Sequence, residues 1–219
     1  MLRALFEKTG NAVYISHLDL MRLFQRGFKR AGLHLTHTQG FSPRPSVSIA
    51  LPLSVGVESR CELLDFELDG EQISCDEILV RLNNALVEGV RVLSVYDGGD
   101  KIKNLALLDC SVYLEYDKGV CANAAEQLQQ LFSQPSLIVQ KRGKNGVTQQ
   151  DLIPMIRSLK IEPEDANTLR LDARVCCQHP TLNPVQFIAA IERYLPELKP
   201  DFVRYCRNEI YCLDVSIFR

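Results

Sequence analysis

The sequence predicts an α+β fold made of two similar halves, each with the ferredoxin-like order β-α-β-β-α-β and mainly antiparallel sheets with helices packed on one face. Three observations lead to this prediction. Strand-like alternation and helical periodicity follow one another in that order over residues 1–98, and the order roughly repeats over residues 104–219. Between them, Asp97-Gly98-Gly99-Asp100-Lys101 is a linker composition. The 219 residues suit two domains of about 100 residues each.

The first half contains clear helix and strand signals. Both expected helices begin at a serine followed three residues later by an acidic residue, which is a capping pattern: Ser16 with Asp19, and Ser74 with Glu77. The first helix is expected to run to about Ala31 and to end at Gly32. Alternation of apolar and polar residues predicts strands at residues 2–7, 46–51, 64–68 and 90–96.

The second half repeats the order of elements without residue-level identity. Helices are expected over residues 122–133 and after Asn183-Pro184. Pro154 favours an edge position for its segment, and the turn residues 142–146 predict a hairpin. Extended segments are expected at residues 107–116, 136–142, 150–161, 169–175 and 209–217.

The charge is unevenly distributed along the chain. The whole chain has a net charge of −2, whereas residues 1–60 carry eight Lys or Arg and three Asp or Glu, which gives +5 there and −7 in the remainder. A positive first quarter suits an anionic partner such as RNA. A solvated helix face is an equally good explanation.

The chain shows the features of a protein of the reducing cytoplasm. Its start is too charged for a signal peptide, and no apolar run approaches the ~20 residues that span a bilayer. We therefore expect a cytoplasmic protein with no membrane partner. Its eight cysteines are scattered without a C-x-x-C pair, so most are expected to be buried side chains and not disulfides or metal ligands.

The stretch of residues 34–60 and the helix before it provide the candidate binding residues. Pro43 and Pro45 restrict the backbone around Arg44, which lowers the entropy lost when its guanidinium binds a phosphate or carboxylate. Phe41 is either a stacking platform for a base or a core anchor, and the anchor is favoured because most aromatic side chains are buried. The predicted binding residues are Arg22, Arg26, Arg30, Gln39, Phe41, Arg44 and Ser59.

Three of the four histidines, His17, His34 and His37, lie early in the chain. His17 follows the expected helix cap, where the helix dipole favours a neutral imidazole. The catalytic candidates are His17, Asp19, His37 and Glu58, as an acid–base cluster. Hydrogen-bonded loop histidines are the alternative, and no metal-binding motif supports a metal site.

Four segments resemble the radical SAM-linked protein family. They are Tyr14–Arg22, Phe28–Leu33, Gln39–Pro45 and Leu51–Ser59, and the similarity is dense over about residues 1–70 and looser beyond. This is a bacterial family without an assigned function, found alone or joined to a radical S-adenosylmethionine (SAM) protein. Relatives often have Asn at the position of Ser42.

The resemblance implies a radical SAM protein as partner, which would supply the iron–sulfur cluster and S-adenosylmethionine. No cofactor is expected on this chain, because it lacks a C-x-x-x-C-x-x-C motif. Three hypotheses follow: an accessory domain that presents tRNA, rRNA or another anionic substrate to the partner; a ribonuclease-like or RNA-modifying enzyme that uses His17 and Asp19; and a protein–protein adaptor with no nucleic-acid role. Self-contained enzyme activity is the less favoured of these.

Overall fold

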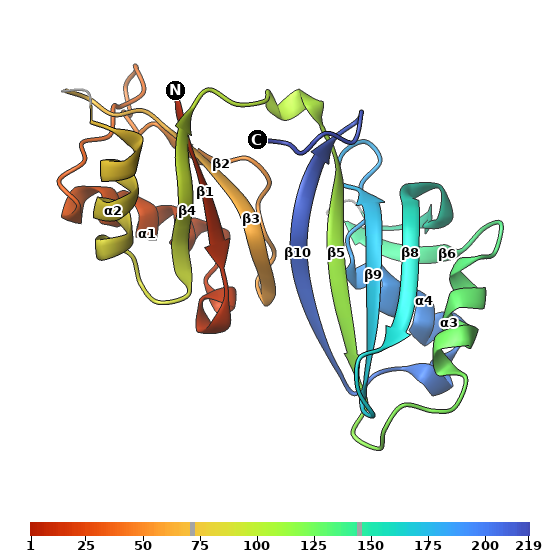
Figure 1. The fold of residues 1–219 in the computed structure, drawn as a ribbon. Helices are drawn as coiled ribbons and strands as arrows, with labels where there is room; N and C mark the ends of the chain where they lie inside the picture. Colours follow the sequence, from red (N-terminus) through yellow and green to blue (C-terminus); the bar gives the residue numbers. More distant parts are fainter. Residues whose placement is uncertain (71–72, 144–145) are drawn as a thin grey trace. The chain divides into compact units, whose positions relative to one another are not determined.

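The computed structural model describes residues 1–70, 73–143 and 146–219. The described residues form a mixed α+β structure with four α-helices and mostly antiparallel strand pairing (Figure 1). The chain divides into two compact units: unit 1 comprises Met1–Asn104 with Phe218–Arg219, and unit 2 comprises Leu105–Ile217. Within the described part of the chain, no helix is both long and apolar enough to cross a bilayer.

Unit 1 has a sheet in the order β4-β1-β3, with β2 paired to β3, and every one of these pairs is antiparallel. Strand β1 is therefore bordered on both sides. The elements are β1 (Leu2–Lys8), the 3-10 helix η1 (Gly10–Tyr14), α1 (His17–Arg30), β2 (Val47–Ile49), β3 (Val57–Phe66), α2 (Cys75–Ala85), β4 (Val90–Asp97) and η2 (Ile102–Asn104).

Both helices of unit 1 begin where the capping pattern predicted. The Ser16 side chain accepts a hydrogen bond from the backbone N–H of Asp19, and Ser74 accepts one from Glu77. After α1 the chain reverses at Gly32, which has a φ of +69°, a conformation that glycine adopts without strain. Side chains of both helices share one apolar core with strands β1, β3 and β4, including Phe6, Phe24, Phe28, Phe66, Ile78, Leu82 and Val92. The helices therefore cover the same face of this sheet.

The other face of the unit 1 sheet buries an ion pair between β1 and β3. Arg3 is 2% exposed, and its guanidinium donates to both carboxylate oxygens of Asp65, at 2.5 and 3.0 Å. The ring of Phe218 lies 5.4 Å from that guanidinium, and a Cβ on Gly99 would lie 2.6 Å from it. The alternation in the sequence suggested that Asp65 lies on a polar face, but the carboxylate is buried because Arg3 is its cross-strand neighbour.

Unit 2 contains a sheet in the order β10-β5-β9-β8 with antiparallel neighbours, and a separate hairpin formed by β6 and β7. Its helices begin near the predicted positions. The elements are β5 (Leu105–Glu115), α3 (Ala124–Phe132), β6 (Ile138–Gly143), β7 (Gly146–Asp151), η3 (Ile153–Met155), β8 (Ile156–Pro163), β9 (Thr168–Cys176), α4 (Val185–Tyr194), η4 (Pro196–Leu198) and β10 (Phe202–Cys212).

Three strand predictions for unit 2 are corrected by the structure. The extended segment expected at residues 150–161 is interrupted by η3 at Ile153–Met155. The hairpin around residues 142–146 is confirmed, with residues 144 and 145 outside the described part, but its first strand pairs with β7 and not with the sheet. The closing strand was expected at residues 209–217, whereas β10 ends at Cys212. The strand ends there because Asp214 accepts hydrogen bonds from the backbone and hydroxyl of Ser216, which forms a tight turn.

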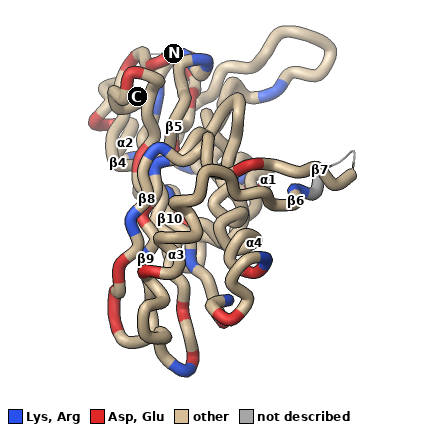
Figure 2. Tube along the Cα trace, turned by 90° about the vertical axis from the view of Figure 1, so that its right-hand side faces the viewer, with Lys and Arg blue, Asp and Glu red and all other residues tan. Residues whose placement is uncertain are grey.

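The unit 2 sheet has one apolar and one polar face. Val112, Leu114 and Leu171 are fully buried. On the opposite face of the same strands, Asp109 and Arg174 are charged and partly exposed. Figure 2 shows basic and acidic positions mixed along these strands and not gathered by sign.

The cysteines are free thiols, as the sequence predicted, and six of the eight are buried. Burial raises the pKa of Cys110 to about 12 and that of Cys177 to about 11. At neutral pH both thiols therefore stay protonated and react slowly.

We predict that replacement of Asp65 by alanine lowers the free energy of unfolding by about 3–5 kcal/mol, because it leaves the buried Arg3 guanidinium without a counter-charge. Urea denaturation followed by circular dichroism measures this value. The double variant Arg3→Leu/Asp65→Leu serves as the control and is expected to lose much less. Equal losses in the single and double variants contradict the assignment of the pair.

We also predict that iodoacetamide at pH 8 labels the exposed Cys121 quickly and leaves Cys110 and Cys177 unlabelled until urea is added, since their raised pKa values keep them as thiols. Peptide mass spectrometry distinguishes the positions. Labelling of Cys110 at the rate of Cys121 in the native protein contradicts this.

Candidate RNA-binding surface of unit 1

Residues 36–46 form a narrow arm that projects from the end of the unit 1 sheet. Its two legs are joined by hydrogen bonds from Thr38 N to Arg44 O at 2.8 Å, from Arg44 N to the Thr38 hydroxyl at 3.1 Å and from Ser46 N to Thr36 O at 2.8 Å. Both legs are also bonded to Glu67, whose carbonyl accepts from Thr36 N and whose N–H donates to Ser46 O. The base of the arm is thus fixed on the chain that continues β3.

Phe41 lies at the tip of this arm with a fully exposed ring, at 112% of its reference area. The core-anchor role favoured from the sequence is therefore wrong, because the arm turns away from the core before it reaches this residue. Gln39 and Arg44 are exposed on the same arm, as is His37 at its base. The arm presents an aromatic ring, an amide and a guanidinium to solvent.

Helix α1 carries the other predicted cations on its exposed side. Arg22 forms an ion pair with Asp19 at 2.9 Å, and Arg30 donates two hydrogen bonds to the carbonyl of Ala85 at the end of α2. Within the described residues, the side chains of Arg26 and Lys29 have no ion-pair partner. These two cations are the ones that α1 leaves available to an anion.

The four candidate catalytic residues do not form a cluster. Asp19 accepts hydrogen bonds from Ser16 and Arg22, which lower the pKa of its carboxyl group. His17 is half-buried, and its Nδ1 is buried without a hydrogen-bond partner among the described residues. His37 lies on the arm and Glu58 lies on β3, and no hydrogen bond within the described part of the chain joins any two of the four.

A buried lysine holds together two of the segments that carry the family resemblance. The Lys8 ammonium donates to the carbonyls of Val13 at 3.1 Å and Ile15 at 2.9 Å, which fixes the turn before α1. The carbonyl of Val13 also accepts from the N–H of Gly56, at 2.8 Å. Burial lowers the pKa of Lys8, and the negative charge of Glu62 opposes that shift.

Sequence reasoning missed Lys8, although a lysine that continues the apolar alternation of β1 was a signal for a buried cation. Ser59, which was proposed as a binding residue, lies next to it in the strand pairing and is 0% exposed. Its hydroxyl accepts a hydrogen bond from the backbone of Cys61. Ser59 therefore belongs to the buried interior of this region and is not part of its surface.

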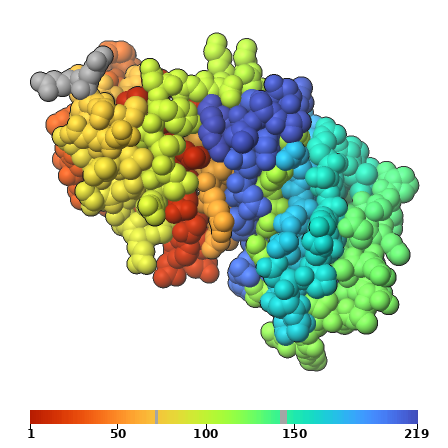
Figure 3. Space-filling model, in the orientation of Figure 1, coloured from red at the N-terminus to blue at the C-terminus, as the bar shows by residue number. Residues whose placement is uncertain are grey.

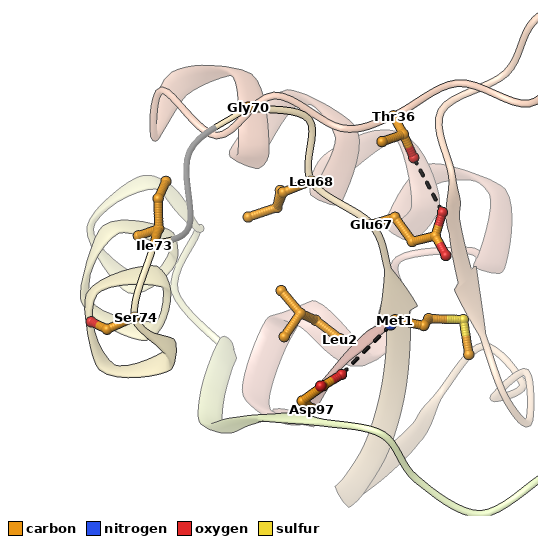
Figure 4. Close-up of a pocket in the computed structure, with 9 residues that line it drawn as sticks. All are labelled: Met1, Leu2, Thr36, Glu67, Leu68, Gly70, Ile73, Ser74 and Asp97. Atoms are coloured by element: carbon orange, nitrogen blue, oxygen red, sulfur yellow. Dashed lines mark hydrogen bonds and ion pairs between the residues drawn. The ribbon is translucent and has the colours of Figure 1, made fainter.

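A hollow of about 670 Å³ lies at the end of the unit 1 core. Figure 4 shows Leu2, Leu68 and Ile73 around it, with Glu67 and Asp97 at its rim. Thr36 donates to Glu67 at 3.5 Å, and the terminal ammonium of Met1 lies 3.6 Å from Asp97. None of the residues proposed from the sequence lines this hollow.

The structure offers no metal site in the part of the chain that it describes: no three His, Cys, Asp or Glu side chains there gather as a ligand set. The exposed groups of unit 1 are instead suited to non-covalent binding. Cations and an aromatic ring can contact the phosphates and bases of a nucleic acid.

Comparisons with known proteins place the chain in a bacterial family. The family model described as "Uncharacterized protein conserved in bacteria (DUF2344)" matches residues 1–184. No curated protein matches the chain.

Two solved structures show weak similarity. An unknown protein from Galdieria sulphuraria is 11% identical, with 94% of this chain and 96% of that chain covered and a TM-score of 0.27. A candidate glycine cleavage system transcriptional repressor is 15% identical, with coverage of 94% and 97% and a TM-score of 0.24. Superpositions this poor support no argument about fold or function. The family match covers most of the 219 residues, and the chain therefore belongs to DUF2344, a family of uncharacterized proteins conserved in bacteria.

Proposed function

We propose that this protein is a binding module that holds RNA, such as tRNA or rRNA, and presents it to a radical SAM enzyme. The observation that carries the proposal is the full exposure of Phe41 at the tip of an arm whose base is fixed by hydrogen bonds. A large exposed aromatic ring costs free energy in water, and stacking on an unpaired base offsets that cost.

Exposed cations on the arm and on α1 support an anionic ligand. Arg44 lies on the arm, and Arg26 and Lys29 lie on the exposed side of α1 without ion-pair partners among the described residues. Such cations bind phosphates and release the counterions around them. The radical SAM partner is inferred from the resemblance of the motifs to radical SAM-linked proteins. In this proposal the partner carries the iron–sulfur cluster and S-adenosylmethionine, and both proteins act in the cytoplasm.

The ferredoxin-like organisation of both halves is part of the proposal. It is supported by the same antiparallel arrangement in the two units, with strand orders β4-β1-β3-β2 and β10-β5-β9-β8. Open antiparallel sheets of this kind serve as RNA-binding platforms in other proteins.

A protein–protein adaptor is the second candidate. It is favoured by three exposed apolar side chains on the segments that Lys8 holds together: Tyr14 at 69%, Leu18 at 67% and Val55 at 56%. An adaptor and an RNA module are compatible, because these residues and the arm lie on different segments.

We predict that the protein binds single-stranded RNA in a salt-sensitive way and that Phe41→Ala weakens binding by roughly 1–3 kcal/mol, the usual value for one stacked base. Arg26→Glu and Arg44→Ala are each expected to weaken binding and to reduce the slope of log K against log salt by about 1. Fluorescence anisotropy with a labelled RNA at several salt concentrations measures both quantities. Lys118→Ala, an exposed cation in unit 2, is the control. If the folded protein shows no detectable RNA binding at low salt, the RNA proposal is wrong.

The adaptor candidate predicts that Leu18→Glu abolishes co-purification with a radical SAM protein encoded beside this chain, because it places a charge in an apolar contact. Val80→Glu, at another exposed apolar residue, is the matched control. Unchanged recovery of the partner with Leu18→Glu counts against the adaptor surface.

A further inference from the structure

The polar face of the unit 2 sheet contains two assemblies of the same design. In each, an arginine lies over a tyrosine ring and is held by a carboxylate. Arg174 lies 4.2 Å from the ring centre of Tyr211 and donates to both oxygens of Asp109, at 2.7 and 2.8 Å. Arg204 lies 4.6 Å from the ring centre of Tyr113 and donates to Glu115 at 2.5 Å. In Figure 3, strand residues coloured blue to cyan lie at the surface of this unit on the side that faces the viewer.

These contacts fix the arginine planes before any ligand arrives. The Tyr211 hydroxyl donates to Asp109 at 3.0 Å, so the tyrosine, the guanidinium and the carboxylate each contact the other two. A guanidinium immobilised in this way loses little further entropy when a second planar group stacks on it. Nucleobases stack on arginine planes as well as on aromatic rings in RNA complexes.

A hollow of about 440 Å³ adjoins the first assembly. Its polar lining comes from Asp109, Ser158, Lys160, Asp172, Arg174 and Asn208. Asp172 is held by hydrogen bonds from Ser111 at 2.5 Å and Arg170 at 2.9 Å. The amide nitrogen of Asn208 donates to the Ser111 hydroxyl at 2.8 Å, which leaves its carbonyl oxygen as an acceptor.

The arginines of this face are paired with carboxylates, which distinguishes it from the exposed side of α1, where Arg26 and Lys29 have no ion-pair partner among the described residues. The arginines at positions 170, 174 and 204 each have a carboxylate partner. The face therefore has little net attraction for phosphate. The face instead presents a fixed guanidinium plane beside oxygen atoms that can accept hydrogen bonds. The plane suits stacking against the flat face of a nucleobase, and the acceptors suit the N–H groups at its edge.

We propose that this hollow binds one unpaired purine base of RNA, stacked on Arg174, with its N–H groups directed to Asp172 and Asn208. A purine is favoured because its larger ring system covers more of the guanidinium plane. Asp109 and Tyr113 are four residues apart on β5, or about 13 Å. The Arg204 assembly is thus placed to stack a base further along the strand. This inference rests on the proposed RNA-binding function but concerns a different unit and a different kind of contact.

The test titrates the full-length protein with 2-aminopurine riboside, whose fluorescence is quenched by stacking, and with a short RNA that contains 2-aminopurine. Arg174→Lys keeps the charge and removes the plane, so we expect at least about fivefold weaker binding, comparable to the loss of one stacked base. Arg193→Lys is the matched control, since Arg193 lies 5.3 Å from the ring of Tyr194 on helix α4, away from the polar face. Binding of the riboside is expected to change little with salt.

A second variant keeps the result interpretable if Arg174→Lys destabilises the fold. Asn208→Ala leaves the arginine assembly intact and is expected to reduce the preference for purine over pyrimidine ribosides. Wild-type quenching in both folded variants, or no quenching by the native protein, overturns the inference.

The outcomes for the two units are distinguishable. If Phe41→Ala weakens RNA binding and Arg174→Lys does not, the proposed function stands and this inference is wrong. If the riboside binds at Arg174 but RNA binding is absent or insensitive to Phe41, the hollow is a base site and the unit 1 proposal fails.

Discussion

The burial of two cations on the central strand β1 is the constraint on which unit 1 depends. A buried cation must find acceptors, because desolvation of an unpaired charge costs several kcal/mol. Arg3 meets this requirement with the carboxylate of Asp65 on one face of the sheet, and Lys8 meets it with two backbone carbonyls on the other. The two cations therefore fix the β1–β3 pairing and the turn that leads into α1.

The function proposed for unit 1 depends on the segments that its buried contacts position. Lys8 fixes the carbonyls of the η1–α1 turn, and the carbonyl of Val13 in turn holds the loop that ends at Gly56. The apolar side chains exposed there lie on segments whose backbones are fixed, and the arm that carries Phe41 is fixed at its base by hydrogen bonds to Glu67. Preorganised segments of this kind bind with a smaller entropic penalty than free loops. The two proposed roles, RNA binding and partner docking, both rest on this property.

On the polar face of the unit 2 sheet, the constraint is the pairing of opposite charges. Arginines and carboxylates at cross-strand neighbouring positions neutralise each other's charge, as the ion pair of Asp109 with Arg174 shows. The sequence displayed the alternation of Arg170, Asp172 and Arg174 with apolar residues, and this alternation correctly indicated one buried and one exposed face. It did not indicate that Arg174 stacks on Tyr211, because Tyr211 comes from another strand.

The sequence by itself determined several local features: the two serine caps, the glycine after α1 and the positions of most strands, although β3 begins at Val57 and not at the predicted residue 64. These depend on contacts within a few residues, so their signals lie in short patterns. Only the tertiary structure decided that Phe41 is exposed, that Ser59 and Asp65 are buried and that Lys8 joins two distant segments. Those outcomes depend on strand register and on partners up to 62 positions away, which the sequence alone does not pair.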